Sequence, residues 1–130
     1  MLVELIREQE ARTSAEIRVC VTDKLVFRPQ RFAWRLFDDI GMRETRERNA
    51  ALIVMMPRVK KIVVIGDKAL HETVGDSYWQ STVSAMVRKM HASGPLESIR
   101  EGLQLLGDTL AAHWPRKDGD INELPDEIVR

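Results

Sequence analysis

Two short and unbroken apolar runs lie close together near the middle of the chain. Residues 51–56 read Ala-Leu-Ile-Val-Met-Met, and residues 62–65 read Ile-Val-Val-Ile. Apolar runs of this length are typical of strands that are covered on both faces. Because only five residues separate the runs, there is no room for a crossover helix. We therefore expect the two strands to form an antiparallel hairpin at the centre of a sheet.

A third strand is predicted upstream of the hairpin. Over residues 15–22, apolar residues alternate with Arg18, Cys20 and Thr22, which is the period-two pattern of a half-exposed strand near a sheet edge. Between this strand and the hairpin, apolar residues recur at helical spacing over residues 32–40. A strand, a helix and a second strand in this order are typical of a right-handed parallel crossover, so we expect a mixed sheet.

The remaining sequence adds helices to this sheet. Further helices are predicted at residues 1–12, 68–74, 77–92 and 96–114. The predicted fold class is α/β, a three-layer α/β/α sandwich whose mixed central sheet combines one parallel crossover with an antiparallel hairpin and is flanked by helices. We expect a single domain over residues 1–115 and a polar C-terminal tail over residues 116–130.

Composition argues against several classes of function. The chain has 20 Lys and Arg residues against 20 Asp and Glu residues, so no overall positive field attracts nucleic acid, and we expect no nucleic-acid partner. No apolar run approaches the roughly 20 residues that span a bilayer, so we expect a soluble protein without direct membrane insertion. The single cysteine, Cys20, cannot form an internal disulfide, which favours a cytoplasmic location.

The basic residues are nevertheless concentrated in one part of the sequence. Ten basic residues against four acidic residues lie between Lys24 and Lys61. Such an excess could serve an acidic protein, an anionic lipid or RNA, but Phe32 and Phe37 have the spacing of core residues and not of stacking platforms. The pattern favours charges that are interspersed on exposed faces of helices and loops.

Several short phrases of the sequence occur in the order that is found in one known family. They lie at residues 14–18, 37–41, 48–53, 62–67, 74–76 with Trp79, and 122–126. Together they resemble the TPM-domain family, which is named for a thylakoid lumen phosphatase-like protein, a photosystem II repair protein and a receptor modulator. The last phrase, Asn-Glu-Leu-Pro-Asp, is similar to that of a bacterial subgroup of soluble, single-domain members.

The resemblance implies a mixed sheet flanked by helices. It also implies calcium binding, which some members show, and weak acid phosphatase activity, which has been attributed to others. The sequence departs from the family pattern at two positions, because Ala15 and Ala50 stand where glycine is usual. These alanines remove close backbone approach and freedom at positive φ, so a ligand site that is shaped by the glycines would be altered.

The predicted topology points to one site without reference to the family. The start of the first strand, the start of the second and the end of the third share one edge of the sheet, where Glu16, Asn49 and Asp67 would meet. Asp76, at the start of a helix, would fold back to the same edge. Oxygen ligands of this kind are those that Ca²⁺ or Mg²⁺ uses. The family resemblance favours Ca²⁺ over Mg²⁺ or Zn²⁺. The competing interpretation makes Asp76 a helix cap, Asp67 a turn residue and Glu16 a solvated strand end.

Three functions are compatible with these features. The leading prediction is a binding or interaction module that holds a divalent cation at this sheet edge. The first alternative is a weak metal-assisted acid phosphatase, in which the ion activates water and Arg48 binds the phosphate. The second alternative is a purely structural module that binds an unidentified, membrane-associated protein partner.

Overall fold

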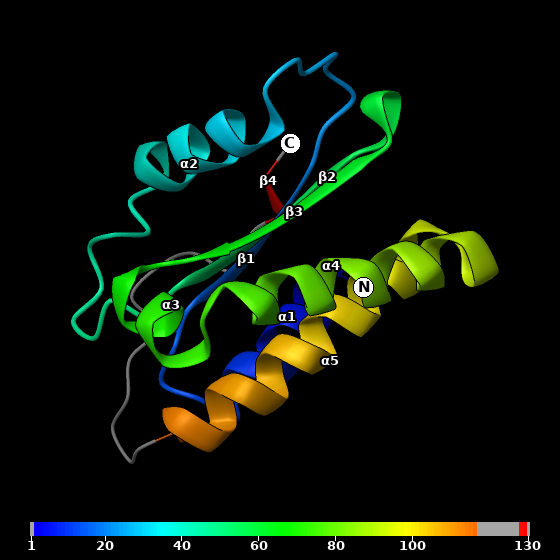
Figure 1. Ribbon diagram of the computed structural model, residues 1–130. Coiled ribbons are helices and arrows are strands. Elements are labelled where there is room, and N and C mark those ends of the chain that lie inside the picture. The colour runs from blue at the N-terminus through cyan, green and yellow to red at the C-terminus, as the bar shows by residue number, and fades with distance from the viewer. Residues whose placement is uncertain (1, 117–127, 130) are drawn as a thin grey trace.

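The computed structural model places the predicted hairpin in a four-stranded sheet that is flanked by helices (Figure 1). It describes residues 2–116 and 128–129. The helices are α1 (Leu2–Glu10), α2 (Pro29–Asp39), η1 (Pro57–Val59, a 3-10 turn), α3 (Lys68–Val74), α4 (Asp76–Ser93) and α5 (Pro95–His113). The strands are β1 (Ile17–Val21), β2 (Ala51–Met56), β3 (Lys61–Gly66) and β4 (Ile128–Val129). Every helix and strand that the sequence predicts is present, and η1 and β4 are additional.

Strands β2 and β3 form the antiparallel hairpin, with Ala51 opposite Gly66 at its open end. The turn η1 closes the other end, where Lys60 has a left-handed backbone with a φ of 55°. All six residues of β2 are buried, as expected for a strand that is covered on both faces. The prediction from the two apolar runs is therefore confirmed.

Strand β1 lies inside the sheet, parallel to both of its neighbours. It pairs with β2 from Ile17 opposite Ala51 to Val21 opposite Met55, and α2 makes the crossover between them. On its other side β1 pairs with β4, so the strand order is β3-β2-β1-β4. As expected, β1 lies near a sheet edge, since only the two-residue β4 lies beyond it, and β4 itself has no signature in the sequence. On the other side of the sheet, the edge strand is β3.

The predicted half-exposure of β1 is wrong. Arg18, Cys20 and Thr22, which alternate with the apolar residues of the strand, are all buried. Cys20 packs in the apolar core beneath α2, together with Ala33 and Phe37 of that helix. Period-two alternation usually separates a core face from a solvent face, but here the second face is covered by α2 and holds a buried charge.

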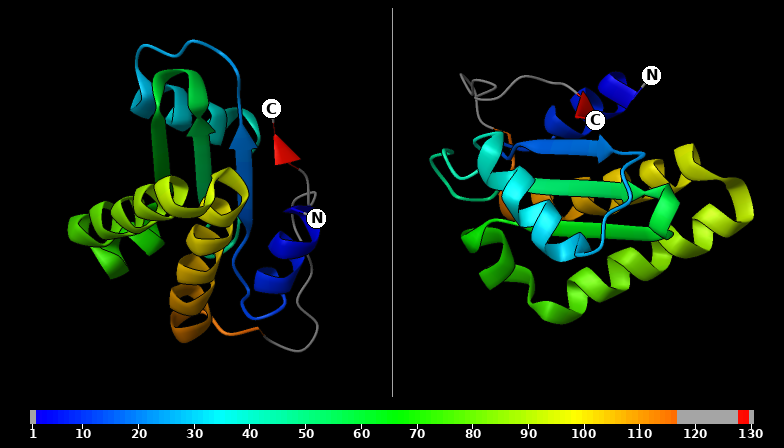
Figure 2. Two further views of the ribbon diagram at one scale, coloured as in Figure 1. Left: turned by 90° about the vertical axis from the view of Figure 1, so that its right-hand side faces the viewer. Right: turned by 90° about the horizontal axis from the view of Figure 1, so that it is seen from above.

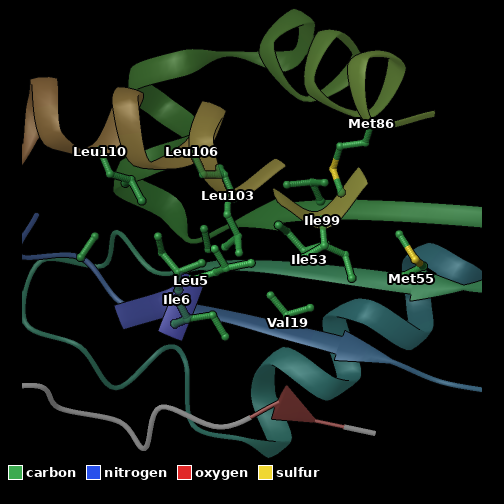
Figure 3. Close-up of a cluster of buried hydrophobic side chains, with 14 of the residues drawn as sticks. Leu5, Ile6, Val19, Ile53, Met55, Met86, Ile99, Leu103, Leu106 and Leu110 are labelled. Atoms are coloured by element: carbon green, nitrogen blue, oxygen red, sulfur yellow. The ribbon is translucent and has the colours of Figure 1, made fainter. Parts of the chain in front are cut away.

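The helices form two layers around the sheet. Helix α2 covers one face, and α1, α4 and α5 cover the other, which confirms the α/β/α sandwich (Figures 1 and 2). Figure 3 shows the larger core, where Ile53 of β2 lies among side chains of α4 and α5 that include Met86, Ile99 and Leu103. This rigid arrangement fixes the loops at both ends of the sheet.

Two sequence-based expectations concern the periphery of the fold. Within the described ranges, no helix is long and apolar enough to cross a membrane. Most of the predicted polar tail, residues 117–127, lies outside the described residues. The proposed domain boundary at residue 115 therefore stays a prediction.

Candidate functional site

Three chain segments come together where β1 and β2 begin and β3 ends (Figure 1). The backbone N–H of Ala51 donates to the carbonyl of Glu16 at 2.9 Å, and the N–H of Asp67 donates to the carbonyl of Ala50 at 2.9 Å. The backbones of Glu16, Asn49 and Asp67 are therefore neighbours, as the predicted topology requires. We call this region the Asp67 end of the sheet.

Asp67 is the central charge of this region. Its side chain is completely buried, and Oδ1 caps α3 by accepting a hydrogen bond from the backbone N–H of Lys68 at 2.8 Å. The guanidinium of Arg48 donates twice to the same carboxylate, from Nε to Oδ2 at 2.6 Å and from Nη2 to Oδ1 at 2.8 Å. Burial opposes the charge of Asp67, but the bonds from Arg48 and Lys68 outweigh it and hold the pKa of Asp67 below its ordinary value.

Arg48 reaches Asp67 from an unusual backbone conformation. Its φ is 52°, in the left-handed region that residues other than glycine rarely adopt. Its carbonyl accepts a hydrogen bond from the N–H of Ala69 at 2.9 Å, so backbone and side chain both tie the segment before β2 to α3. The side chain of Arg48 is 41% exposed. A half-exposed guanidinium therefore balances a fully buried carboxylate.

A second guanidinium lies beside the first. Nη1 of Arg43 is 3.7 Å from Oδ1 of Asp67, and its side chain is also partly exposed. The guanidinium packs over the rings of Trp34 and Phe37, at 5.3 Å and 5.6 Å from the ring centres. Nε of Arg43 also pairs with the carboxylate of Asp38. Two guanidiniums, each with a carboxylate partner, therefore lie at the rim of the buried Asp67.

The other predicted ligands near Asp67 have different surroundings. Glu16 is buried and pairs with Nη2 of Arg18 at 3.3 Å, while Nη1 of Arg18 donates to Glu10 at 2.7 Å. Glu16 is therefore part of a buried charge cluster. Asn49 is also buried, and its Nδ2 has no hydrogen-bond partner within the described part of the chain. Because an unpaired buried donor is costly, Asn49 is a candidate for contact with a ligand or water oxygen.

Asp76 faces solvent on the outer side of β3, with 90% of its side chain exposed. Its Oδ1 lies 3.5 Å from Nε2 of His71, and Nδ1 of His71 accepts a hydrogen bond from Nε1 of Trp79 at 3.0 Å. Gly75 and not Asp76 occupies the cap position of α4. Asp76, His71 and Trp79 line a hollow of about 350 Å³, whose other walls are Gln30, Trp34, Val64, Ile65, Gly66 and Gln80.

The sequence matches the family model described as the TPM domain over residues 1–109. The chain belongs to the TPM-domain family. The matched range contains the complete hairpin, β1 and the Asp67 end of the sheet. The phrase at residues 122–126, which suggested a bacterial subgroup, lies outside both the matched range and the described residues, so that subgroup stays a prediction.

A solved structure has the same fold as this TPM domain. It is the NMR structure of the BA42 protein from the psychrophilic bacterium Bizionia argentinensis, with a TM-score of 0.89 and 30% sequence identity. The similarity covers 98% of this chain and 88% of that chain. A comparison with curated proteins gives no significant match.

The four predicted metal ligands of this TPM domain do not form a ready-made cation site. Among the residues that the structure describes, no group of three or more His, Cys, Asp or Glu side chains is arranged to hold a metal ion. Both oxygens of Asp67 already accept hydrogen bonds, Glu16 is paired with Arg18, and Asp76 faces solvent. A cation fits at Asp67 only where the side chain of Arg48 moves away.

Sequence reasoning found residues of this site but not their partners. Arg48, predicted to bind phosphate, has two of its nitrogens engaged with Asp67, and its phosphate-binding role stays a prediction. The parts that sequence reasoning missed are Arg43 and the hydrogen-bonded pair of His71 and Trp79. Arg43 stands in a stretch rich in other arginines, and the pair spans the break between two helices, so neither has a periodic signal.

Proposed function

We propose that this TPM domain is a binding module for a divalent cation, of which Ca²⁺ is the first candidate. The cation binds at the Asp67 end of the sheet and replaces the guanidinium of Arg48 as the partner of Asp67. The observation that supports this proposal is the contrast between the two partners. The carboxylate of Asp67 is completely buried, whereas the guanidinium that balances it is 41% exposed.

A buried carboxylate requires a positive partner, because an isolated buried charge is strongly unfavourable. Arg48 supplies that charge from a loop, through a side chain that water reaches and a backbone that is held at a φ of 52°. Both features lower the free energy that is needed to separate the guanidinium of Arg48 from Asp67. Asp67 would then offer carboxylate oxygens of the kind that Ca²⁺ prefers, and Asn49, whose backbone is a neighbour of Asp67, is the second predicted ligand. Glu16 and Asp76 remain predicted ligands.

The exchange makes a prediction that an ordinary metal site does not make. Because Arg48 and the cation compete for the same carboxylate, Arg48→Gln is expected to strengthen Ca²⁺ binding, whereas Asp67→Asn abolishes it. A backbone amide NMR titration with Ca²⁺, Mg²⁺ and Zn²⁺ measures this on the wild type and both variants. The expected shifts cluster at residues 48–50 and 66–69.

A third variant, Asp76→Asn, tests whether this exposed carboxylate is a ligand, because the substitution leaves the buried ion pair untouched. If Asp76 is not a ligand, this variant titrates like the wild type, and a loss of binding identifies it as one. Arg48→Gln that remains well folded and shows no shifts up to millimolar Ca²⁺ would overturn the exchange. The ion pair would then be only a structural link between the loop before β2 and α3.

The metal-assisted acid phosphatase is the second candidate. The observation that favours it is the pair of partly exposed guanidiniums, Arg43 and Arg48, on one rim. In that case Arg48→Gln would lower turnover of an aryl phosphate even while cation binding becomes stronger. Turnover of the aryl phosphate, measured with each ion on the same variants, separates the two candidate functions. If no turnover rises above background, the phosphatase candidate is excluded.

A further inference from the structure

Two loops stand side by side at the end of the sheet opposite to Asp67. They are the connection between β1 and α2, residues 22–28, and the turn of the hairpin, residues 57–61 (Figures 1 and 2). The N–H of Thr22 donates to the carbonyl of Met55 of β2 at 3.1 Å, so the first loop leaves the sheet beside the end of β2, from which the hairpin turn follows. The two loops therefore lie at the same end of the sheet.

The first loop holds two large apolar side chains in solvent. Leu25 is 53% exposed and Phe27 is 84% exposed, whereas Val26 between them is buried in the core beneath α2. Val26 thus anchors the loop while its two neighbours point outward. A phenylalanine with most of its surface in water is unfavourable unless something covers it.

Cationic side chains surround these two residues. Lys24, Arg28, Arg31 and Arg35 come from the loop and α2, and Arg58, Lys60 and Lys61 come from the hairpin turn. All seven are exposed, and across the described part of the chain none of them has an acidic partner within ion-pair distance. Asp23 is the one acidic residue within residues 22–36 and 57–61, and Asp39 of α2 lines a hollow together with Lys24 and Arg35.

Three of the arginines converge on one place. Arg28, Arg31 and Arg35 line a single shallow hollow together with Val26 and Phe32. Because the whole chain has no net charge, this concentration of cations leaves an excess of acids elsewhere. The protein is therefore polarised, with its positive end at the exposed Leu25 and Phe27. We call Leu25, Phe27 and the seven cations around them the Phe27 patch.

We propose that the Phe27 patch binds the surface of a bilayer that contains anionic phospholipid. Leu25 and Phe27 enter the interface between head groups and acyl chains, and the cations pair with head-group phosphates, with Arg28, Arg31 and Arg35 around one of them. Apolar side chains at the tip of a loop, ringed by cations, match a surface that is apolar below and negative above. For RNA, Phe27 would be the one aromatic platform of the patch, whereas the exposed pair of Leu25 and Phe27 matches the acyl boundary of a bilayer.

This proposal is independent of the cation site at the other end of the sheet. It departs from the sequence-based expectation of no direct membrane insertion, because peripheral binding needs only exposed loop residues and no spanning helix. The sequence pattern favoured basic residues that are interspersed on exposed faces, but many of them lie together in the fold. The part of the basic excess that lies at residues 24–35 and 58–61 shares one end of the molecule.

Sedimentation with phospholipid vesicles tests the proposal. The protein should sediment with vesicles of phosphatidylcholine mixed with an equal amount of phosphatidylglycerol, and remain in solution with phosphatidylcholine alone. Binding should fall as salt is raised, because exposed charges are screened. The variant Leu25→Ser/Phe27→Ser should bind at least about tenfold more weakly, since it loses the buried apolar area.

A pair of single arginine variants provides the matched control. Arg31→Gln should weaken binding about fivefold, the effect of one cation near an anionic surface. Arg7→Gln changes an exposed arginine of α1, on the opposite face of the sheet, and should bind like the wild type. Circular dichroism of each variant checks that the fold is retained.

Two results would overturn the membrane assignment. One is equal binding to both kinds of vesicle, or to neither. The other is undiminished binding of the double serine variant to the anionic vesicles, which would mean that the patch recognises negative charge only. RNA or an acidic protein would then be the better partner.

Discussion

Arg48 and Asp67 are 19 residues apart in the sequence, and their side chains are joined by two hydrogen bonds of 2.6 and 2.8 Å. The pair links the segment before β2 to the first turn of α3, next to the backbone hydrogen bond from Ala69 to Arg48. The residue predicted to bind phosphate and the central residue of the predicted metal site are therefore bonded to each other. A ligand at either residue must break or use this pair.

The pair should stabilise the fold. Arg48→Gln removes a bidentate, charge-assisted contact and is expected to lower the free energy of unfolding at neutral pH. Asp67→Asn should cost a similar amount, because Asp67 also caps α3. Urea unfolding of the two single variants and the double variant measures the coupling between them. Purely additive losses would mean that the contact contributes nothing of its own.

The same pair makes stability depend on pH. The pKa of Asp67 is lower in the folded protein than in the unfolded chain, so the folded state releases the proton more readily. Its contribution is fully present above the unfolded pKa, at about 4, and is lost as the pH falls through the lower folded value. In Arg48→Gln the main opposing cation is gone, so this acid-dependent loss should be smaller. An unchanged acid dependence would assign it to other carboxylates.

Arg18 is a second place where charge is buried. Its guanidinium lies between Glu10 at 2.7 Å and Glu16 at 3.3 Å, and all three side chains are buried. Arg18→Met removes the cation between two carboxylates and should cost about 3–5 kcal/mol. Combining it with Glu10→Gln and Glu16→Gln should recover most of the loss, since no unbalanced charge then remains. Urea unfolding of the single and triple variants checks this.

The elements that were predicted correctly are those with a local signal. Unbroken apolar runs and a five-residue gap predict the β2–β3 hairpin, and helical spacing predicts the helices. What the sequence did not predict depends on contacts between distant segments. Pairing with β4 places β1 inside the sheet, and Glu10, from another element, makes the burial of Arg18 possible.

The candidate site shows the same division. Strand topology was enough to bring the backbones of Glu16, Asn49 and Asp67 to one end of the sheet. Strand topology does not predict the partners of the side chains, because these depend on details such as the left-handed backbone of Arg48. No spacing rule predicts that conformation. Of the four predicted ligands, Asp67 is buried beside Arg48, whereas Asp76 faces solvent.

Gly66, at the end of β3, allows close packing of Trp79. A Cβ at this position would lie 2.6 Å from the indole ring of Trp79 and 2.7 Å from Leu70. Gly66→Ala should therefore destabilise the protein by about 1–3 kcal/mol and alter tryptophan fluorescence. Gly102→Ala is the comparison: its Cβ would lie 2.5 Å from Sδ and 2.8 Å from Cε of Met86, but these atoms end a flexible side chain, and alanine favours the α5 helix. A larger loss at Gly102 than at Gly66 would contradict this packing argument.

Cys20 tests the burial of the second face of β1. Burial raises the pKa of its thiol above the ordinary value, and Lys24 opposes this only in part. The native protein should therefore react very slowly with a thiol reagent at pH 8, and the urea-unfolded protein should react completely. Fast labelling of the native state would mean that α2 does not cover Cys20 and that β1 is half-exposed, as its alternating sequence predicts. Slow labelling in the destabilised Arg48→Gln variant as well would show that this core stays closed when the Asp67 end is weakened.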